Sequence, residues 1–415
     1  MKTILLVFTE LLLLWAGITG SVVPAPSQSN CVKCHFDNEE ENGPAHQIGR
    51  DIHQQSGLGC PDCHGGNSAL DDMDAVRASS GYRGVPDRLE IPVFCSRCHS
   101  DARYMHEHNP SLSVDQLEKY QTSVHGMRLA QKKDRKVATC VSCHTAHSIG
   151  SAKLPYSSTY PPNLPITCGH CHADKAYMAE YGIPTDQLEK YTRSVHGIAL
   201  LERGDLGAPA CNDCHGNHGA APPGIASLDA VCGLCHAIES RLFDGSPHRP
   251  AFVAQGLPMC ETCHGNHEIA KPSDSLIGLA EGQLCATCHA ADDQSKASAD
   301  ILKVSAGLRS LSIATDSAAH MLRMAGAKGM MITDEEFMLK EVGQIRVQAR
   351  STVHAFAADS LTPKVEEGIT KAEDVRKRAV KLIEEYDFRR FGLGIASIFI
   401  TLLALGLYLK IRRLV

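Results

Sequence analysis

The chain has 415 residues and a formal net charge of −6, without a basic stripe, which argues against nucleic acid as a partner. Only 5% of the residues are aromatic and one is tryptophan, whereas 18 are cysteine. A chain of this length normally folds into two or three domains with apolar cores. Because large apolar side chains are scarce, we expect a group other than side chains to form part of the apolar core.

The first 25 residues have the features of an export signal. Lys2 precedes an apolar run from Ile4 to Ile18 that only Glu10 interrupts, and small residues and prolines follow. This pattern predicts a secretory signal peptide over residues 1–25. We expect the signal to be cleaved, and an uncleaved anchor is the alternative. Either outcome exports the residues that follow.

The pattern Cys-x-x-Cys-His occurs nine times and uses all 18 cysteines. We number these motifs 1 to 9 in chain order. The pattern is typical of c-type haem attachment, because two thiols at this spacing reach the two vinyl groups of one porphyrin and leave the adjacent imidazole against the iron. A disulfide-rich domain or zinc ribbons would also pair cysteines, but neither requires the histidine. The sequence therefore predicts nine covalently attached haem c groups.

Each motif supplies two thioethers and the proximal iron ligand. The predicted thioether residues are Cys31, Cys34, Cys60, Cys63, Cys95, Cys98, Cys140, Cys143, Cys168, Cys171, Cys211, Cys214, Cys232, Cys235, Cys260, Cys263, Cys285 and Cys288. The predicted proximal ligands are His35, His64, His99, His144, His172, His215, His236, His264 and His289. With about 29 residues per motif there is too little chain for a core around each haem, so the porphyrins themselves should form the core.

An internal duplication organises the predicted haem domain, residues 26–294. Asp115–Gly126 and Asp186–Gly197 agree at ten of twelve positions, and the distance to the next motif is the same in both. Shorter copies flank this pair, which gives four two-haem units plus motif 9. Repetition of this kind favours an elongated stack. The fold class should be mainly α with extensive loops and little or no sheet, because Gly and Pro punctuate the region and strand periodicity is missing.

Nine of the thirteen remaining histidines are candidates for the distal side of the irons. Seven recur at fixed offsets from motifs, four before a motif and three after one. His46 replaces a trailing histidine where the first unit has Asn67, and His354 is preferred to His320 for motif 9, which has no local partner. The predicted distal ligands are His46, His53, His125, His147, His196, His218, His248, His267 and His354. An iron held between two histidines passes electrons without an open position for substrate, whereas an open sixth position invites chemistry.

Residues 295–387 contain no cysteine and have apolar residues at alternating three- and four-residue spacing. This periodicity predicts a bundle of antiparallel helices. A capping box at Thr333–Glu336 should open the second helix, and Thr362 with Pro363 should open the third. We interpret the bundle as a structural element, with partner docking as the alternative. His354 on its second helix would join it to the haem domain.

Residues 391–409 are nineteen uncharged positions, enough for one transmembrane helix. Basic residues lie on both sides of this segment, so charge alone does not orient it. The export signal places the haems outside and residues 410–415 in the cytoplasm. The expected location is therefore the cytoplasmic (inner) membrane, with a single span and the haem domain on the periplasmic face.

The Tyr-x-x-Ser-Val-His-Gly…Cys-x-x-Cys-His-x-x-His units over residues 95–218 resemble the multihaem c-type cytochromes of anaerobic and metal-respiring bacteria. The tail, from Thr352 to Arg413, resembles that of a subset anchored by a C-terminal helix. This second resemblance implies a quinol-oxidising cytochrome b subunit as partner.

From these features we expect an electron carrier that relays electrons from a quinol-oxidising membrane partner to periplasmic acceptors in anaerobic respiration. One alternative is an oxidoreductase of nitrogen or sulfur oxyanions with one open haem, although no motif ends in the lysine of pentahaem nitrite reductases. Another is a quinol dehydrogenase that needs no b-type subunit.

Overall fold

The computed structural model describes residues 29–38, 43–220, 231–290 and 294–414, and the predicted signal peptide lies outside these ranges. Every regular element in the described ranges is a helix, which confirms the mainly α fold class. The chain divides into two compact units, residues 1–223 and 224–415. The division falls well before residue 294, so motifs 7 to 9 belong to the same unit as the helical bundle.

The helices of unit 1 are short because Gly and Pro recur between them. They are α2 (Asn30–Asn38), α3 (Pro44–Gln47), α4 (Ile52–Gln55), α5 (Cys60–His64), α6 (Ile91–His99), α7 (Ala102–His108), α8 (Gln116–Thr122), α9 (Val124–Lys132), α10 (Cys140–His144), α11 (Leu164–His172), α12 (Lys175–Met178), α13 (Gln187–Arg193), α14 (Val195–Gly197) and α15 (Cys211–His215). The 3-10 turns η1 to η5 and the π-helical turn η6 (Ile198–Glu202) lie among them.

The predicted duplication is visible as a repeated bend between two helices. Tyr120 in α8 donates its hydroxyl to Ala138 O at 2.7 Å, and Tyr191 in α13 donates to Pro209 O at 2.8 Å. The next helix then starts so close that a Cβ on Gly126 would lie 1.9 Å from Tyr120 O. The glycine of Ser-Val-His-Gly is therefore required by this close approach, and the bend aims the neighbouring histidine inward.

Buried apolar clusters are small in unit 1 and larger in unit 2. Tyr191, Leu200 and Ala210 form a cluster of three buried residues in unit 1. Two clusters with seven and six buried residues lie in the bundle of unit 2. This distribution agrees with the expectation that haem faces supply the apolar interior near the motifs.

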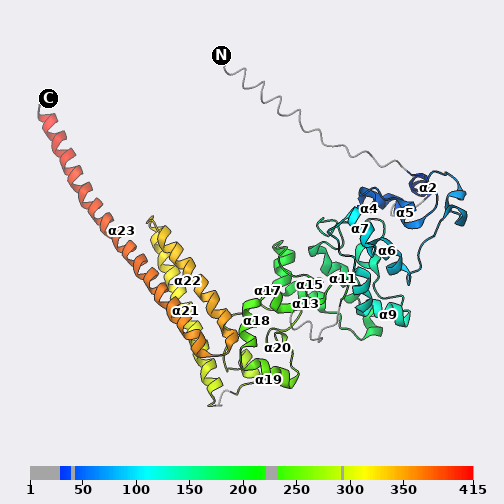
Figure 1. The fold of residues 1–415 in the computed structure, drawn as a ribbon. Coiled ribbons are helices and arrows are strands. Elements are labelled where there is room, and N and C mark those ends of the chain that lie inside the picture. Colours follow the sequence, from blue (N-terminus) through cyan, green and yellow to red (C-terminus); the bar gives the residue numbers. More distant parts are fainter. Residues whose placement is uncertain (1–28, 39–42, 221–230, 291–293, 415) are drawn as a thin grey trace. The chain divides into compact units, whose positions relative to one another are not determined.

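Unit 2 combines short motif helices with the long helices of the bundle. Its elements are α17 (Val231–Cys235), α18 (Ala237–Asp244), α19 (His248–Gln255), α20 (Glu261–His264), η7 (Asp274–Leu276), η8 (Leu284–Thr287), α21 (Lys296–Ala327), α22 (Thr333–Thr352), η9 (Val353–Ala355) and α23 (Ala358–Leu414). In the bundle, α21 and α22 pack along the first half of α23 (Figure 1). Leu308, Leu311 and Val342 are almost fully buried there, as the periodicity predicted.

Both predicted helix starts in the bundle differ from the structure. Thr333 is the first residue of α22, and the N-cap is Ile332, which makes no side-chain capping bond. Thr362 and Pro363 lie inside α23, which begins at Ala358. The earlier start buries Ala358 and Leu361 at 2% exposure each, and this packing outweighs the one backbone bond that Pro363 cannot donate.

The third bundle helix and the predicted span form one continuous helix, α23, of 57 residues. Beyond the end of α21 and α22 this helix continues alone (Figure 1). Its apolar window has a mean hydropathy of 2.1 and none of it is buried in the protein. The helix is long and apolar enough to cross a membrane, which supports a single-pass anchor.

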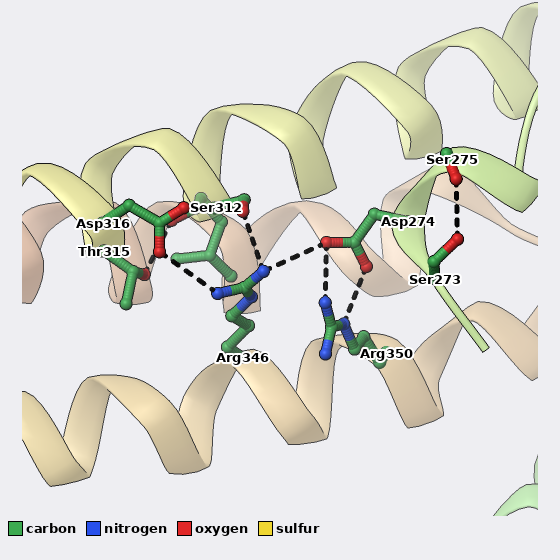
Figure 2. Close-up of polar contacts among 9 residues, drawn as sticks. Ser273, Asp274, Ser275, Ser312, Thr315, Asp316, Arg346 and Arg350 are labelled. Carbon is green, nitrogen blue, oxygen red and sulfur yellow. Dashed lines mark hydrogen bonds and ion pairs between the residues drawn. The ribbon is translucent and has the colours of Figure 1, made fainter. Parts of the chain in front are cut away.

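Asp274 in η7 ties the segment after motif 8 to the bundle, as Figure 2 shows. Its carboxylate accepts two hydrogen bonds from Arg350, at 2.7 and 2.9 Å, and Arg346 lies 3.5 Å away. Ser351 also donates to Glu239 of α18 at 2.5 Å. The bundle is therefore bonded to the haem-binding part of unit 2 through the C-terminal half of α22.

Candidate haem-binding sites

Most motifs fold as a short helix that ends on its histidine, as in α5, α6, α10, α11, α15 and α20. Since cysteines three positions apart lie on the same side of a helix, both thiols of such a motif face one porphyrin edge. The helices of motifs 1, 3 and 5 have nine residues each, whereas those of motifs 2, 4 and 6 have five. The two-haem unit predicted from sequence thus contains a long and a short motif helix.

The chain reverses directly after the histidine of the even-numbered motifs. Gly65, Thr145, Gly216 and Gly265 occupy this position with φ between 66° and 78°. Thr145 is not glycine, so its left-handed conformation costs energy that the surrounding contacts must offset. The reversal carries the chain away from its own motif toward another one.

Among the residues that the structure describes, six pairs of imidazole rings face one another across nearly equal gaps. Each pair joins one motif histidine to one predicted distal histidine, and the ring centroids are 5.9–6.1 Å apart. The pairs in unit 1 are His99 with His53, His64 with His147, His172 with His125, and His144 with His218. The pairs in unit 2 are His289 with His248, and His264 with His354.

This spacing fits an iron atom between the rings. An imidazole nitrogen binds a first-row metal at about 2.0 Å and the ring centroid lies roughly 1.1 Å behind it, so two opposed ligands have centroids roughly 6 Å apart. The hydrogen bonds of the rings fit as well. His64 Nδ1 lies 2.9 Å from Gly84 O, and His354 Nδ1 lies 3.0 Å from Ser351 O. An Nδ1–H donor leaves Nε2 available for the metal.

Burial keeps these rings in the protonation state that metal binding requires. It is the main cause that lowers the imidazole pKa of His99, His125, His144, His172, His218, His248 and His264. A lowered pKa favours neutral imidazole, which binds metal, over imidazolium, which does not. His46 Nε2 is also buried and has no hydrogen-bond partner, as expected of a nitrogen reserved for a ligand.

The structure corrects one predicted pairing. His354 was expected to serve motif 9, but its ring faces His264 of motif 8, and His248 faces His289 of motif 9. The physical reason is the register of unit 1, where His53 and His125 each face the second motif that follows them. His248 obeys the same register. His320, the alternative ligand from the bundle, is exposed on α21.

The other predicted ligands are not assigned to particular irons by these six pairs. His35, His196, His215, His236 and His267 each take part in an interaction in the structure, and His46 stacks on Phe36 with centroids 4.1 Å apart. Their roles as iron ligands stay predictions. In the described ranges, no cluster of three or more His, Cys, Asp or Glu side chains is arranged to hold a bare metal ion.

Neighbouring motifs lie next to one another in unit 1. The side chain of Cys95 lies beside that of Cys140, and the side chain of Cys168 lies beside that of Cys211, which places motif 3 next to 4 and motif 5 next to 6. Cys143 and Cys168 interact electrostatically and so connect motifs 4 and 5. The haem attachment points of motifs 3 to 6 therefore follow one another in chain order, which the sequence alone did not determine.

Two residues next to the distal histidines were missed by the sequence reasoning. The ring of Phe356 lies against that of His248, with centroids 3.9 Å apart and the planes tilted by 44°, and Phe356 has a left-handed φ of 49°. The buried Asp51 contacts His53 Nδ1 at 2.9 Å. Burial raises the pKa of this carboxyl, but hydrogen bonds from His53 and Ile149 outweigh burial and hold the pKa below its ordinary value. A signal for Asp51 exists, because serine occupies the same place before His125, His196 and His248.

Comparison with known families agrees with the motifs. The sequence model of the cytochrome c3 family matches residues 52–173, and that of the cytochrome c554 and c-prime family matches residues 20–65. No curated protein and no solved structure is significantly similar to the chain. The matched residues contain motifs 1 to 5. They also contain at least one histidine of each of the four ring pairs in unit 1. The chain is thus a multihaem c-type cytochrome, which binds haem c covalently and transfers electrons.

Proposed function

We propose that this protein carries nine bis-histidine haems and relays electrons between a quinol-oxidising membrane partner and periplasmic acceptors. The observation that carries the proposal is the set of six opposed imidazole pairs, each with one motif histidine and a centroid distance of 5.9–6.1 Å. Bound haem supplies the one-electron chemistry. The paired histidines of the chain would hold each such iron from both sides, which would leave no position for a substrate.

The continuous helix α23 supports a location at the cytoplasmic membrane with the haems on the outer side. It joins the bundle directly to the apolar segment, so the haem units are held to the membrane by a helix without an internal break. The predicted export signal gives the orientation. Anaerobic respiration is the setting in which such a carrier would operate, as the resemblance of its motifs implies.

The length of the bundle supports the need for a second redox protein, which would carry electrons from the quinol in the membrane to the haems of motifs 8 and 9. The 34 residues from Ala358 to Phe391 span about 50 Å at 1.5 Å per residue. His354 lies at the start of this distance, and the ion pair between Lys328 and Asp387, at 3.0 Å, lies close to the span. Direct tunnelling does not cover such a gap, so haems at motifs 8 and 9 would need an intermediate carrier, such as a cytochrome b-type subunit, to receive electrons from the membrane.

Electron paramagnetic resonance of the oxidised full-length protein tests the ligation. We expect low-spin haem only, since two histidines per iron give a strong ligand field. A high-spin signal that accounts for one haem would contradict the proposal and favour the oxyanion oxidoreductase. Haem content per chain, measured in the same sample, tests the number nine.

The partner is tested separately. The protein should co-purify from native membranes with a cytochrome b-type subunit, and a quinol analogue should reduce its haems in that complex but not after the subunit is removed. Rapid reduction of the isolated chain would instead favour the quinol dehydrogenase.

A further inference from the structure

The predicted distal histidine His53 contacts a buried carboxylate. Asp51 is 2% exposed, and its Oδ1 lies 2.9 Å from His53 Nδ1 and also accepts the backbone N–H of His53 at 2.9 Å. Its Oδ2 accepts the N–H of Ile149 at 2.8 Å. Both carboxylate oxygens thus act as hydrogen-bond acceptors, which is the pattern of an ionised carboxylate.

The same position in the other copies carries no charge. Ser123, Ser194 and Ser246 each stand two residues before a predicted distal histidine, and all three are buried. Their hydroxyls are directed at the backbone, because they donate to Tyr120 O, Tyr191 O and Phe243 O at 2.6 to 2.7 Å. All four residues begin a turn that presents the histidine, but only Asp51 places a negative charge on the ring.

We propose that Asp51 is a positioning residue that lowers the reduction potential of the haem held between His53 and His99, relative to the sites whose turns begin with serine. This inference rests on the proposed bis-histidine ligation. His53 reaches the iron through Nε2 and donates Nδ1–H to the carboxylate, which makes the ring a stronger electron donor. Electron donation and the nearby negative charge both favour ferric over ferrous iron. Burial of Asp51 strengthens this effect, since water does not screen the charge.

The affected haem lies inside the row of motifs rather than at its end. The side chain of Cys95 in motif 3 lies beside that of Cys140 in motif 4, and the side chain of Cys63 in motif 2 lies near that of Cys98 in motif 3. A lowered potential at motif 3 therefore forms an energetic step for electrons that pass through this haem.

The test is a redox titration of the full chain, followed by visible absorbance, for Asp51→Asn and Asp51→Ser. Asp51→Asn keeps the shape of the side chain and removes its charge, and Asp51→Ser reproduces the residue of the other copies. Both should shift one single-electron component to a more positive potential and leave the remaining components in place. Asp51→Glu retains the charge, so the potential of this component should shift less than in the two neutral variants.

Asp316→Asn is the control, because it removes one negative charge from an exposed carboxylate of α21 that contacts no predicted iron ligand in the structure. It should leave all potentials unchanged. The proposal is overturned if both neutral variants titrate like the wild type, or if every component shifts equally in them and in the control. Low-spin resonance spectra of the same samples separate this result from failure of the proposed function, which would show as high-spin haem already in the wild type.

Discussion

Replacing Asp274 by asparagine should loosen the attachment of the bundle to the segment after motif 8. The carboxylate is 19% exposed, receives two hydrogen bonds from Arg350 and has Arg346 3.5 Å away (Figure 2). A hydrogen bond to a charged group contributes about 1.5–3 kcal/mol when shielded, whereas exposed ion pairs contribute about 0–1 kcal/mol. Because Arg350 is 41% exposed, we expect an intermediate loss of about 1–2 kcal/mol.

A loss of this size corresponds to a decrease in Tm of about 2–8 °C for a domain of this size. Thermal unfolding of the full-length protein in detergent, followed by far-ultraviolet circular dichroism, measures it. Asp316→Asn is the matched control, because Asp316 lies 3.7 Å from the same Arg346 but is 73% exposed. Its Tm should stay close to the wild-type value. Equal Tm values for the two variants would refute the reasoning.

The same pair predicts a pH dependence with a definite sign. The hydrogen bond from Arg350 is the main cause that lowers the pKa of Asp274 in the folded protein. A carboxyl with a lowered folded pKa stabilises the protein above its unfolded pKa, near about 3.9, and loses this contribution as pH falls through the folded pKa. The difference in Tm between wild type and Asp274→Asn should therefore be constant near neutral pH and shrink below about pH 4.

Electron paramagnetic resonance should resolve two kinds of low-spin haem, because the paired rings are 16–26° from parallel at motifs 2, 4 and 8 but 58–75° apart at motifs 3, 5 and 9. Parallel rings interact with the same iron d orbital and split the orbital energies, whereas crossed rings leave them nearly equal. His354→Ala should convert one haem of the parallel kind to high spin, because His354 faces His264 of motif 8. Gly126→Ala should lower the Tm, since the added Cβ would lie 1.9 Å from Tyr120 O, while Gly343→Ala in α22, with nothing within 4 Å, should be neutral or stabilise by up to about 1 kcal/mol.

Each of these predictions has a contrary outcome. A single kind of low-spin spectrum would contradict the division of the ring pairs into nearly parallel and crossed pairs. Loss of a crossed component in His354→Ala would return His354 to motif 9. For this variant His320→Ala is the control, because His320 is exposed and should leave the spectrum unchanged. A Gly126→Ala protein as stable as the wild type would contradict the close approach to Tyr120.

Covalent and local features of this protein were readable in its sequence. The motifs identify haem c because attachment depends only on two thiols and an adjacent histidine within five residues. The duplicated Ser-Val-His-Gly segment, the helices of the bundle and the apolar segment after Arg390 are likewise local patterns, and the fold shows each of them. The predicted starts of α22 and α23 were wrong. For α23 the reason is that packing of Ala358 and Leu361 against the bundle extends the helix to residues before the expected cap at Thr362.

The pairing of the histidines was decided by the tertiary structure. A distal ligand comes from a different segment than its motif, so its identity depends on the path of the chain between them. The reversal at Thr145 carries His147 back to His64, and the connection through η9 brings His354 to His264 rather than to His289. The charge that Asp51 places on His53 depends in the same way on Ile149, which lies 98 positions away along the chain and holds the carboxylate against the ring. No local propensity encodes such contacts, because they form only when distant segments pack together.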